Sequence, residues 1–137
     1  MQNREIVNWN LYGNAYLRIH EFKYPHAWSY GNMTPGKTDK EKREYIRKIA
    51  LKKFPKTMNK KFAFRILVGK KGDGPFDVDN VPKLVVDAFC KGQIDRDKSK
   101  YKVGLYEDDR LDFVEIIQVF GKRAKDNFTR VEIFAHQ

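Results

Sequence analysis

Two carboxylates stand one residue apart near the middle of this 137-residue chain, at Asp77 and Asp79. Asn80 follows directly, and Lys83 comes one helical turn later. Carboxylate oxygens are ligands that a hard cation such as Mg²⁺ prefers, and a nearby ammonium group can neutralise a phosphate. The set suits phosphodiester hydrolysis, in which a metal lowers the pKa of a bound water and stabilises developing charge.

A second acidic pair, Asp108 and Asp109, lies well beyond Asp87 in a chain whose net charge is +10. We expect Asp109 to reach the first pair from the start of a later strand. A domain this basic usually meets nucleic acid. An anionic membrane is the other common partner, but the sequence lacks a basic amphipathic helix with a broad apolar face. The charge therefore favours a nucleic-acid partner.

Each of these acidic groups also has a purely structural interpretation. Two aspartates separated by one residue often belong to turns or helix caps. Asp79 and Lys83 have the spacing of an ordinary helical ion pair, and Asp108 with Asp109 could form a turn before a strand. Only their combination with a basic surface favours catalysis.

The pattern of apolar residues predicts one α+β domain over residues 1–137, with a mixed sheet and two helices packed on one face. Strands are predicted at 15–24, 62–68, 111–120 and 129–135. A capping box of Thr38 and Glu41 predicts a helix from 39 to about 53. Asn80 as N-cap and Pro82 in the first turn predict a second helix, which Gly92 would end. Residues 93–104 and 121–128 are predicted loops.

Basic residues outside the acidic motif are candidates for contacts with DNA phosphates. The candidates are Lys48, Lys52, Lys70, Lys71, Lys122 and Arg123. The first helix also contains Arg43 and Arg47, which we place on its surface, away from the apolar stripe. That surface is either a solvated face or a phosphate-contacting face. Trp28 and Tyr30, in the loop over 25–38, either cover the core or stack on a base.

Several other classes of protein are disfavoured. Cys90 is the one cysteine, so an internal disulfide is impossible and a reducing, cytoplasmic setting is the simplest expectation. No run of about 18 apolar residues is available to span a membrane. Gly69–Gly74 lacks the ending of a phosphate-binding P-loop. In the stretch that begins at Asp95, Lys100 replaces the glycine that an EF-hand requires. We expect no small-molecule cofactor.

The acidic motif resembles that of the RusA family of Holliday-junction resolvases. The family pattern is D-x-D-N with a lysine shortly after, then D-A-[LF], then an acidic pair that opens a strand. Here it reads Asp77-Val-Asp-Asn-Val-Pro-Lys83, Asp87-Ala-Phe89 and Tyr106-Glu-Asp-Asp-Arg110. The segment between Asp87 and Asp108 is longer than the family's usual connection, and it could extend a DNA-binding loop or alter junction preference.

The resemblance implies a small homodimeric, Mg²⁺-dependent endonuclease, bacterial or prophage-encoded, that cuts four-way DNA junctions symmetrically in recombination and repair. Mn²⁺ is the expected substitute for Mg²⁺. Asp77, Asp79 and Asp109 would be catalytic metal ligands with Asp108 as a helper, and Lys83 would be a catalytic lysine. Two alternatives remain open: a non-catalytic nucleic-acid-binding module, and a nuclease for another branched DNA or for RNA.

Overall fold

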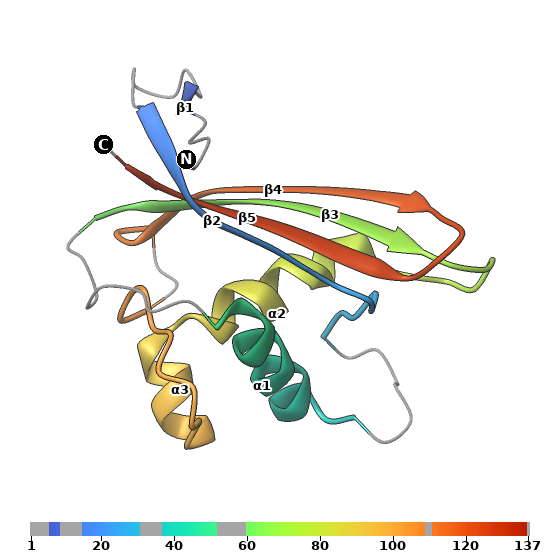
Figure 1. Ribbon diagram of the computed structural model, residues 1–137, viewed down its shortest axis with the longest axis horizontal. Coiled ribbons are helices and arrows are strands. Elements are labelled where there is room, and N and C mark those ends of the chain that lie inside the picture. The colour runs from blue at the N-terminus through green and yellow to red at the C-terminus, as the bar shows by residue number, and fades with distance from the viewer. Residues whose placement is uncertain (1–5, 9–14, 31–36, 52–59, 109–110, 137) are drawn as a thin grey trace.

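Five strands form one mixed sheet in the computed structural model of the chain, which describes residues 6–8, 15–30, 37–51, 60–108 and 111–136 (Figure 1). The strands are β1 (Ile6–Asn8), β2 (Ala15–Tyr24), β3 (Phe62–Lys70), β4 (Val114–Arg123) and β5 (Phe128–His136). Their order is β1-β2-β5-β3-β4, and only β3 and β4 run parallel among these neighbours. The predicted α+β class with a mixed sheet is confirmed.

The helices all lie against one face of this sheet (Figure 1). They are α1 (Asp39–Ala50), the 3₁₀ helix η1 (Val78–Asn80), α2 (Val81–Ala88) and α3 (Lys91–Asp97). The packing on one face was predicted correctly, but the number of helices was not, because α3 begins the segment that we predicted as a loop. Gly92 lies inside α3, and α2 already ends at Ala88.

Two buried residues explain why α3 was missed. Ile94 supplies its apolar contact with the core, and the second inward residue is Asp97, which is 5% exposed. A buried carboxylate breaks the apolar periodicity that a sequence reading depends on. The helix can bury Asp97 because arginines from α1 bind it.

The start of α1 matches the prediction, while its end does not. Thr38 Oγ1 accepts from the Glu41 N–H, and the Glu41 carboxylate accepts from the Thr38 N–H, so the capping box is present. The helix ends at Ala50 rather than near 53. There His20 Nε2 donates to the Ala50 carbonyl at 2.9 Å, which satisfies one of the terminal carbonyl groups.

The core lies between the sheet and the helices. Alternate residues of β3, from Phe62 to Val68, point towards the helices and are almost completely buried. β4 pairs with β3 over its whole length, so it begins at Val114 rather than 111 and continues to Arg123. The predicted loop over 121–128 therefore shortens to the four residues between β4 and β5.

Candidate active site and cationic surface

The acidic motif follows the carboxyl end of β3, one of the two parallel strands. η1, α2 and α3 form the crossover that connects β3 to β4. In open sheets, ligands commonly bind outside the carboxyl ends of parallel strands, where the following loops and helix starts converge. The position of the motif in the fold is therefore one that suits a ligand.

Asp77 and Asp79 present exposed carboxylates at this edge. Asp77 has extended backbone angles and precedes η1, whereas Asp79 lies within η1. The alternation of side chains along an extended strand would put both carboxylates on one side, but the chain turns between them. Neither side chain forms a hydrogen bond or an ion pair with any residue that the structure describes. Asn80 occupies the N-cap position of α2, but its side chain makes no capping bond.

Val78 fixes η1 against β4. A Cβ atom placed on Gly121 would lie 2.6 Å from Val78 Cγ2, so only glycine permits this approach. Beside the contact is a hollow of about 280 Å³. Its lining is formed by Val68, Lys70, Phe76, Val78, Gly121, Lys122 and Arg123. We call it the motif-side hollow, because Phe76 and Val78 flank Asp77.

Lys83 is exposed on α2, and Asp87, one helical turn later, is mostly buried. The Lys83 ammonium is 3.3 Å from Asp87 Oδ1, and the other Asp87 oxygen accepts a hydrogen bond from Tyr30 Oη at 2.8 Å. Tyr30 Oη in turn accepts from Arg43 at 3.0 Å. Burial and the hydrogen bond to Asp87 raise the pKa of Tyr30, so the phenol stays protonated and donating. Asp87 is therefore held in place and can position Lys83.

Asp108 lies at the other end of α2. Cys90 Sγ and the Gly92 N–H both donate to the carbonyl of Glu107, which places the next residue beside the α2–α3 junction. Burial raises the pKa of the Cys90 thiol, and the charges of Asp87 and Asp108 add to the effect. An eight-residue helix is about 12 Å long, so α2 separates Asp108 from Asp77. Asp109 lies outside the described residues.

The donor chemistry at Asp77 and Asp79 fits Mg²⁺. Among the described residues, no group of three or more His, Cys, Asp or Glu is placed to hold a metal ion. Mg²⁺ in phosphoryl-transfer sites is commonly held by one or two carboxylates, with waters and substrate phosphate completing its shell. Two exposed carboxylates with no cationic partner in the part of the chain that the structure describes meet that requirement.

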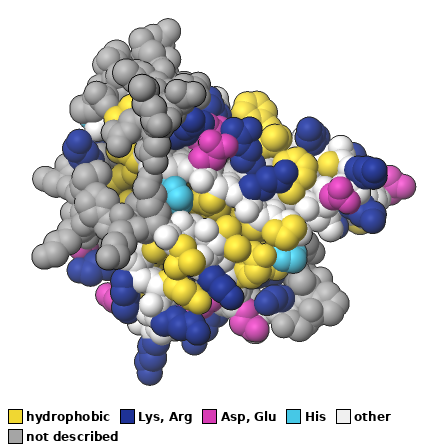
Figure 2. Space-filling view, in the orientation of Figure 1, with side chains coloured by type: hydrophobic (Ala, Val, Ile, Leu, Met, Phe, Trp, Pro, Cys, Tyr) yellow, Lys and Arg dark blue, Asp and Glu magenta, His cyan; other side chains and the backbone are white. Residues whose placement is uncertain are grey.

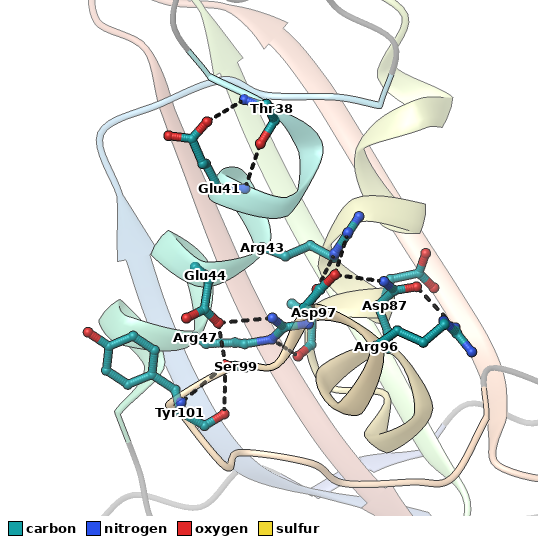
Figure 3. Close-up of polar contacts among 12 residues, drawn as sticks. Thr38, Glu41, Arg43, Glu44, Arg47, Asp87, Arg96, Asp97, Ser99 and Tyr101 are labelled. Carbon is teal, nitrogen blue, oxygen red and sulfur yellow. Dashed lines mark hydrogen bonds and ion pairs between the residues drawn. The ribbon is translucent and has the colours of Figure 1, made fainter.

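Sequence reasoning missed a buried ionic cluster between α1 and α3 (Figure 3). Arg47 is completely buried; it donates to Asp97 at 3.0 Å, to Glu44 at 3.0 Å and to the Ala88 carbonyl at 2.7 Å. Arg43 binds Asp97 through two donors at 2.7 and 2.9 Å. The prediction that both arginines lie on the surface of α1 is therefore wrong. The (i, i+4) spacing of the two arginines does not indicate that they are buried, because the carboxylate that binds them, Asp97, comes from α3.

The predicted phosphate contacts fall into two groups. Lys70, Lys71, Lys122 and Arg123 gather where β3 and β4 end, which we call the sheet tip. Lys48 is exposed on α1, near Ala50 and His20. His20 lies level with Ile133 and Phe64 in the sheet. Phe64 is six residues before Lys70 on β3, so this part of the sheet is roughly 20 Å from the tip. Lys52 lies outside the described residues.

The aromatic residues of the loop after β2, Trp28 and Tyr30, pack against the hydrophobic core. Trp28 is 5% exposed, and His26 stacks on it with ring centroids 4.2 Å apart. Tyr30 is half-buried and engaged with Asp87 and Arg43. Of the two readings of this loop, covering the core is the one that the structure bears out for Trp28.

No family model matches the chain, and no curated protein or solved structure matches it either. None of the described helices has the length and apolar character that crossing a membrane requires. Function must therefore be argued from the site.

Proposed function

We propose that the protein is an Mg²⁺-dependent, structure-selective DNA endonuclease that resolves four-way junctions by paired symmetric nicks. One observation carries this proposal. Asp77 and Asp79 are exposed and have no cationic partner among the described residues, although their chain neighbours Phe76 and Val78 line a hollow with Lys70, Lys122 and Arg123 at the carboxyl end of β3. A site of this kind offers oxygen ligands for a cation and ammonium groups for phosphates.

In this proposal, some side chains of the site bind the DNA backbone and others act on the phosphodiester bond that is cut. Lys70 and Arg123 attract the phosphate backbone to the edge where the two aspartates lie. Lys83, positioned by Asp87, places positive charge near the scissile phosphate or polarises the attacking water. Mg²⁺ held by Asp77, Asp79 and Asp109 would supply Lewis-acid stabilisation of the phosphate charge. The resemblance also implies Asp108 as a helper, but α2 separates it from Asp77, so it takes no part in this scheme.

The resemblance to RusA resolvases supports the narrower parts of the proposal. It is the ground for the four-way junction as substrate, for a homodimer whose subunits each cut one strand, and for a cytoplasmic role in recombination and repair. These features rest on the spacing of Asp77, Asp79, Lys83 and the later acidic pair.

A non-catalytic nucleic-acid-binding module is the second candidate. The position of Asp108 favours it, because α2 separates this residue from Asp77. In that case Asp77 and Asp79 would only reduce the positive charge of the surface that binds nucleic acid.

A cleavage panel separates the two candidates. Labelled four-way junction, flap, linear duplex DNA and RNA are incubated with the protein, with Mg²⁺ or with EDTA. The proposal predicts Mg²⁺-dependent paired nicks in the junction and 5′-phosphate ends that a ligase seals. Binding without cutting on every substrate would favour the module, and preferential cutting of flap or RNA would redirect the activity to another substrate.

A further inference from the structure

The sheet tip has a second cationic hollow, away from Asp77 and Asp79. It lies between the end of β2 and the turn that joins β4 to β5, and its volume is about 870 Å³. Lys23, Lys71 and Lys125 line it, together with Phe128. We call it the turn-side hollow. In Figure 2, Lys and Arg side chains gather at the end of the molecule where Figure 1 places the tip.

The Phe128 ring contacts lysine ammonium groups beside this hollow. A Cβ atom on Gly69 would lie 2.2 Å from the Phe128 ring, so the ring lies directly over the backbone of β3. The ammonium of Lys23 is 4.8 Å from the ring centroid, and that of Lys122 is 5.9 Å from it. Cation–π attraction at these distances holds ammonium groups without neutralising them. Lys23, which lines the hollow, is thus kept in place for a ligand, and Lys122 of the motif-side hollow lies against the same ring.

A hydrogen bond connects the two segments on either side of the turn-side hollow. The Lys71 N–H donates to Asn127 Oδ1 at 2.8 Å, which joins the loop after β3 to the β4–β5 turn. Within the described part of the chain, Lys23, Lys71 and Lys125 form no ion pair with a carboxylate. Among the residues that line the hollow, Asp126 is the acidic one, against the three lysines Lys23, Lys71 and Lys125. Its charge is therefore available to an anion.

We propose that the turn-side hollow binds the phosphate backbone of a second nucleic-acid segment, separate from the segment at the motif-side hollow. Val78 and Phe76 place the motif-side hollow on the helix-covered side of the sheet, whereas Lys23 and Phe128 lie on the opposite face. A straight duplex contacts one side of a sheet at a time. A branched nucleic acid can place one arm on each side of the tip.

The inference extends the proposed function, but its test requires no cleavage. Binding of a labelled four-way junction and of a linear duplex is measured by fluorescence anisotropy in EDTA, over a range of salt concentrations. The variant is Lys23→Gln/Lys125→Gln. The control, Lys60→Gln/Lys102→Gln, removes the same charge from two exposed lysines away from the tip.

The tip variant should bind the junction at least tenfold more weakly than the control variant does, whereas its loss on linear duplex should be about threefold or less. The log–log salt slope for the junction should fall by about 2, because each lost phosphate contact removes about 0.9. Equal losses on junction and duplex, or junction binding like that of the control, would overturn the inference. So would a variant that loses only binding to anionic phospholipid vesicles. If the wild-type protein cuts nothing but the junction-specific loss is observed, the nuclease proposal fails and this one stands.

Discussion

The buried ionic cluster contacts the end of α2, whereas the acidic motif precedes its start, and the two groups differ in how their charges are satisfied. In the buried ionic cluster, Asp97 is bound by Arg43, Arg47 and Gln93. In the acidic motif, Asp77 and Asp79 are exposed and have no partner among the described residues. Removing charges from water is costly unless they are paired, so the first arrangement belongs to the folded structure itself. The second leaves two carboxylates for a ligand outside the chain.

The comparison shows that residue type and spacing do not reveal how a charge is used. Arg47 and Lys48 are neighbours on α1, yet Arg47 is completely buried and Lys48 is exposed. Asp79 and Asp97 are both aspartates within helical turns of the same crossover. Substitutions in the buried ionic cluster should therefore lower the stability of the protein, and substitutions of Asp77 or Asp79 should lower its activity.

Removing one member of the buried cluster should have the largest effect on stability. Arg47→Ala leaves Asp97 buried with fewer donors and removes the donor to the Ala88 carbonyl, so the free energy of unfolding should fall by about 3–5 kcal/mol. Urea denaturation measures it. Lys48→Ala is the matched control and should change stability by less than about 0.5 kcal/mol. Equal effects of the two substitutions would contradict the assignment of Arg47 to the buried cluster.

Acid should weaken the same cluster selectively. Burial by itself raises the pKa of Asp97, but hydrogen bonds from Arg43, Gln93 and Arg47 outweigh it and lower the pKa to about 2. A carboxyl group with a lowered folded-state pKa stabilises the protein above its unfolded pKa, and that stability is lost as pH falls. The contribution of Asp97, about 2 kcal/mol, should therefore disappear between about pH 4 and pH 2. Asp97→Asn should be less stable at pH 7 and lose less stability across this interval.

A methyl group at Gly121 should disturb the acidic motif without touching the buried cluster. Gly121→Ala forces a Cβ atom against Val78 Cγ2, which should cost about 1–3 kcal/mol and displace η1. Metal-dependent cleavage should decline with it. Val78→Ala in the same chain removes the atom in conflict, so the double variant should recover part of the loss measured for Gly121→Ala by urea denaturation. A double variant no better than the single one would argue against this contact.

The hydroxyl group of Tyr30 connects the two regions, and its removal should have the smallest effect. Tyr30→Phe deletes the hydrogen bonds to Asp87 and Arg43, at a cost of about 1 kcal/mol. Asp87 keeps its contact with Lys83, so cleavage should slow only modestly while the KM for the junction stays constant. A large rise in KM would show that Tyr30 contacts the substrate instead of positioning Asp87.

Local signals in the sequence were sufficient for much of the fold. The capping box fixed the start of α1, and alternation of apolar residues located β2 and β3. The end of α2 and the existence of α3 could not be predicted. They depend on a carboxylate, Asp97, that is buried only because two arginines from α1 reach it. Such long-range pairing leaves no local pattern.

The candidate site was also predicted in part. The sequence placed Asp77 and Asp79 just before a helix that begins near Val81, with Lys83 in its first turn, and the structure has them there. It did not predict that Val78 would anchor the motif through Gly121, or that the position of Asp108 would be set by backbone bonds to the α2–α3 junction. Lys23 and Phe128 were overlooked because strand pairing alone brings them beside Lys122.

The role of Asp79 is the most direct test of the central claim that the acidic motif is kept for a ligand. Asp79→Asn and the control Asp95→Asn, an exposed aspartate on α3, are compared with the wild-type protein in cleavage of a four-way junction with Mg²⁺. Junction binding in EDTA and urea stability are measured in parallel. The account predicts that Asp79→Asn loses at least a hundredfold in cleavage rate with binding and stability retained, whereas Asp95→Asn behaves like the wild type. Full cleavage by Asp79→Asn would contradict the account.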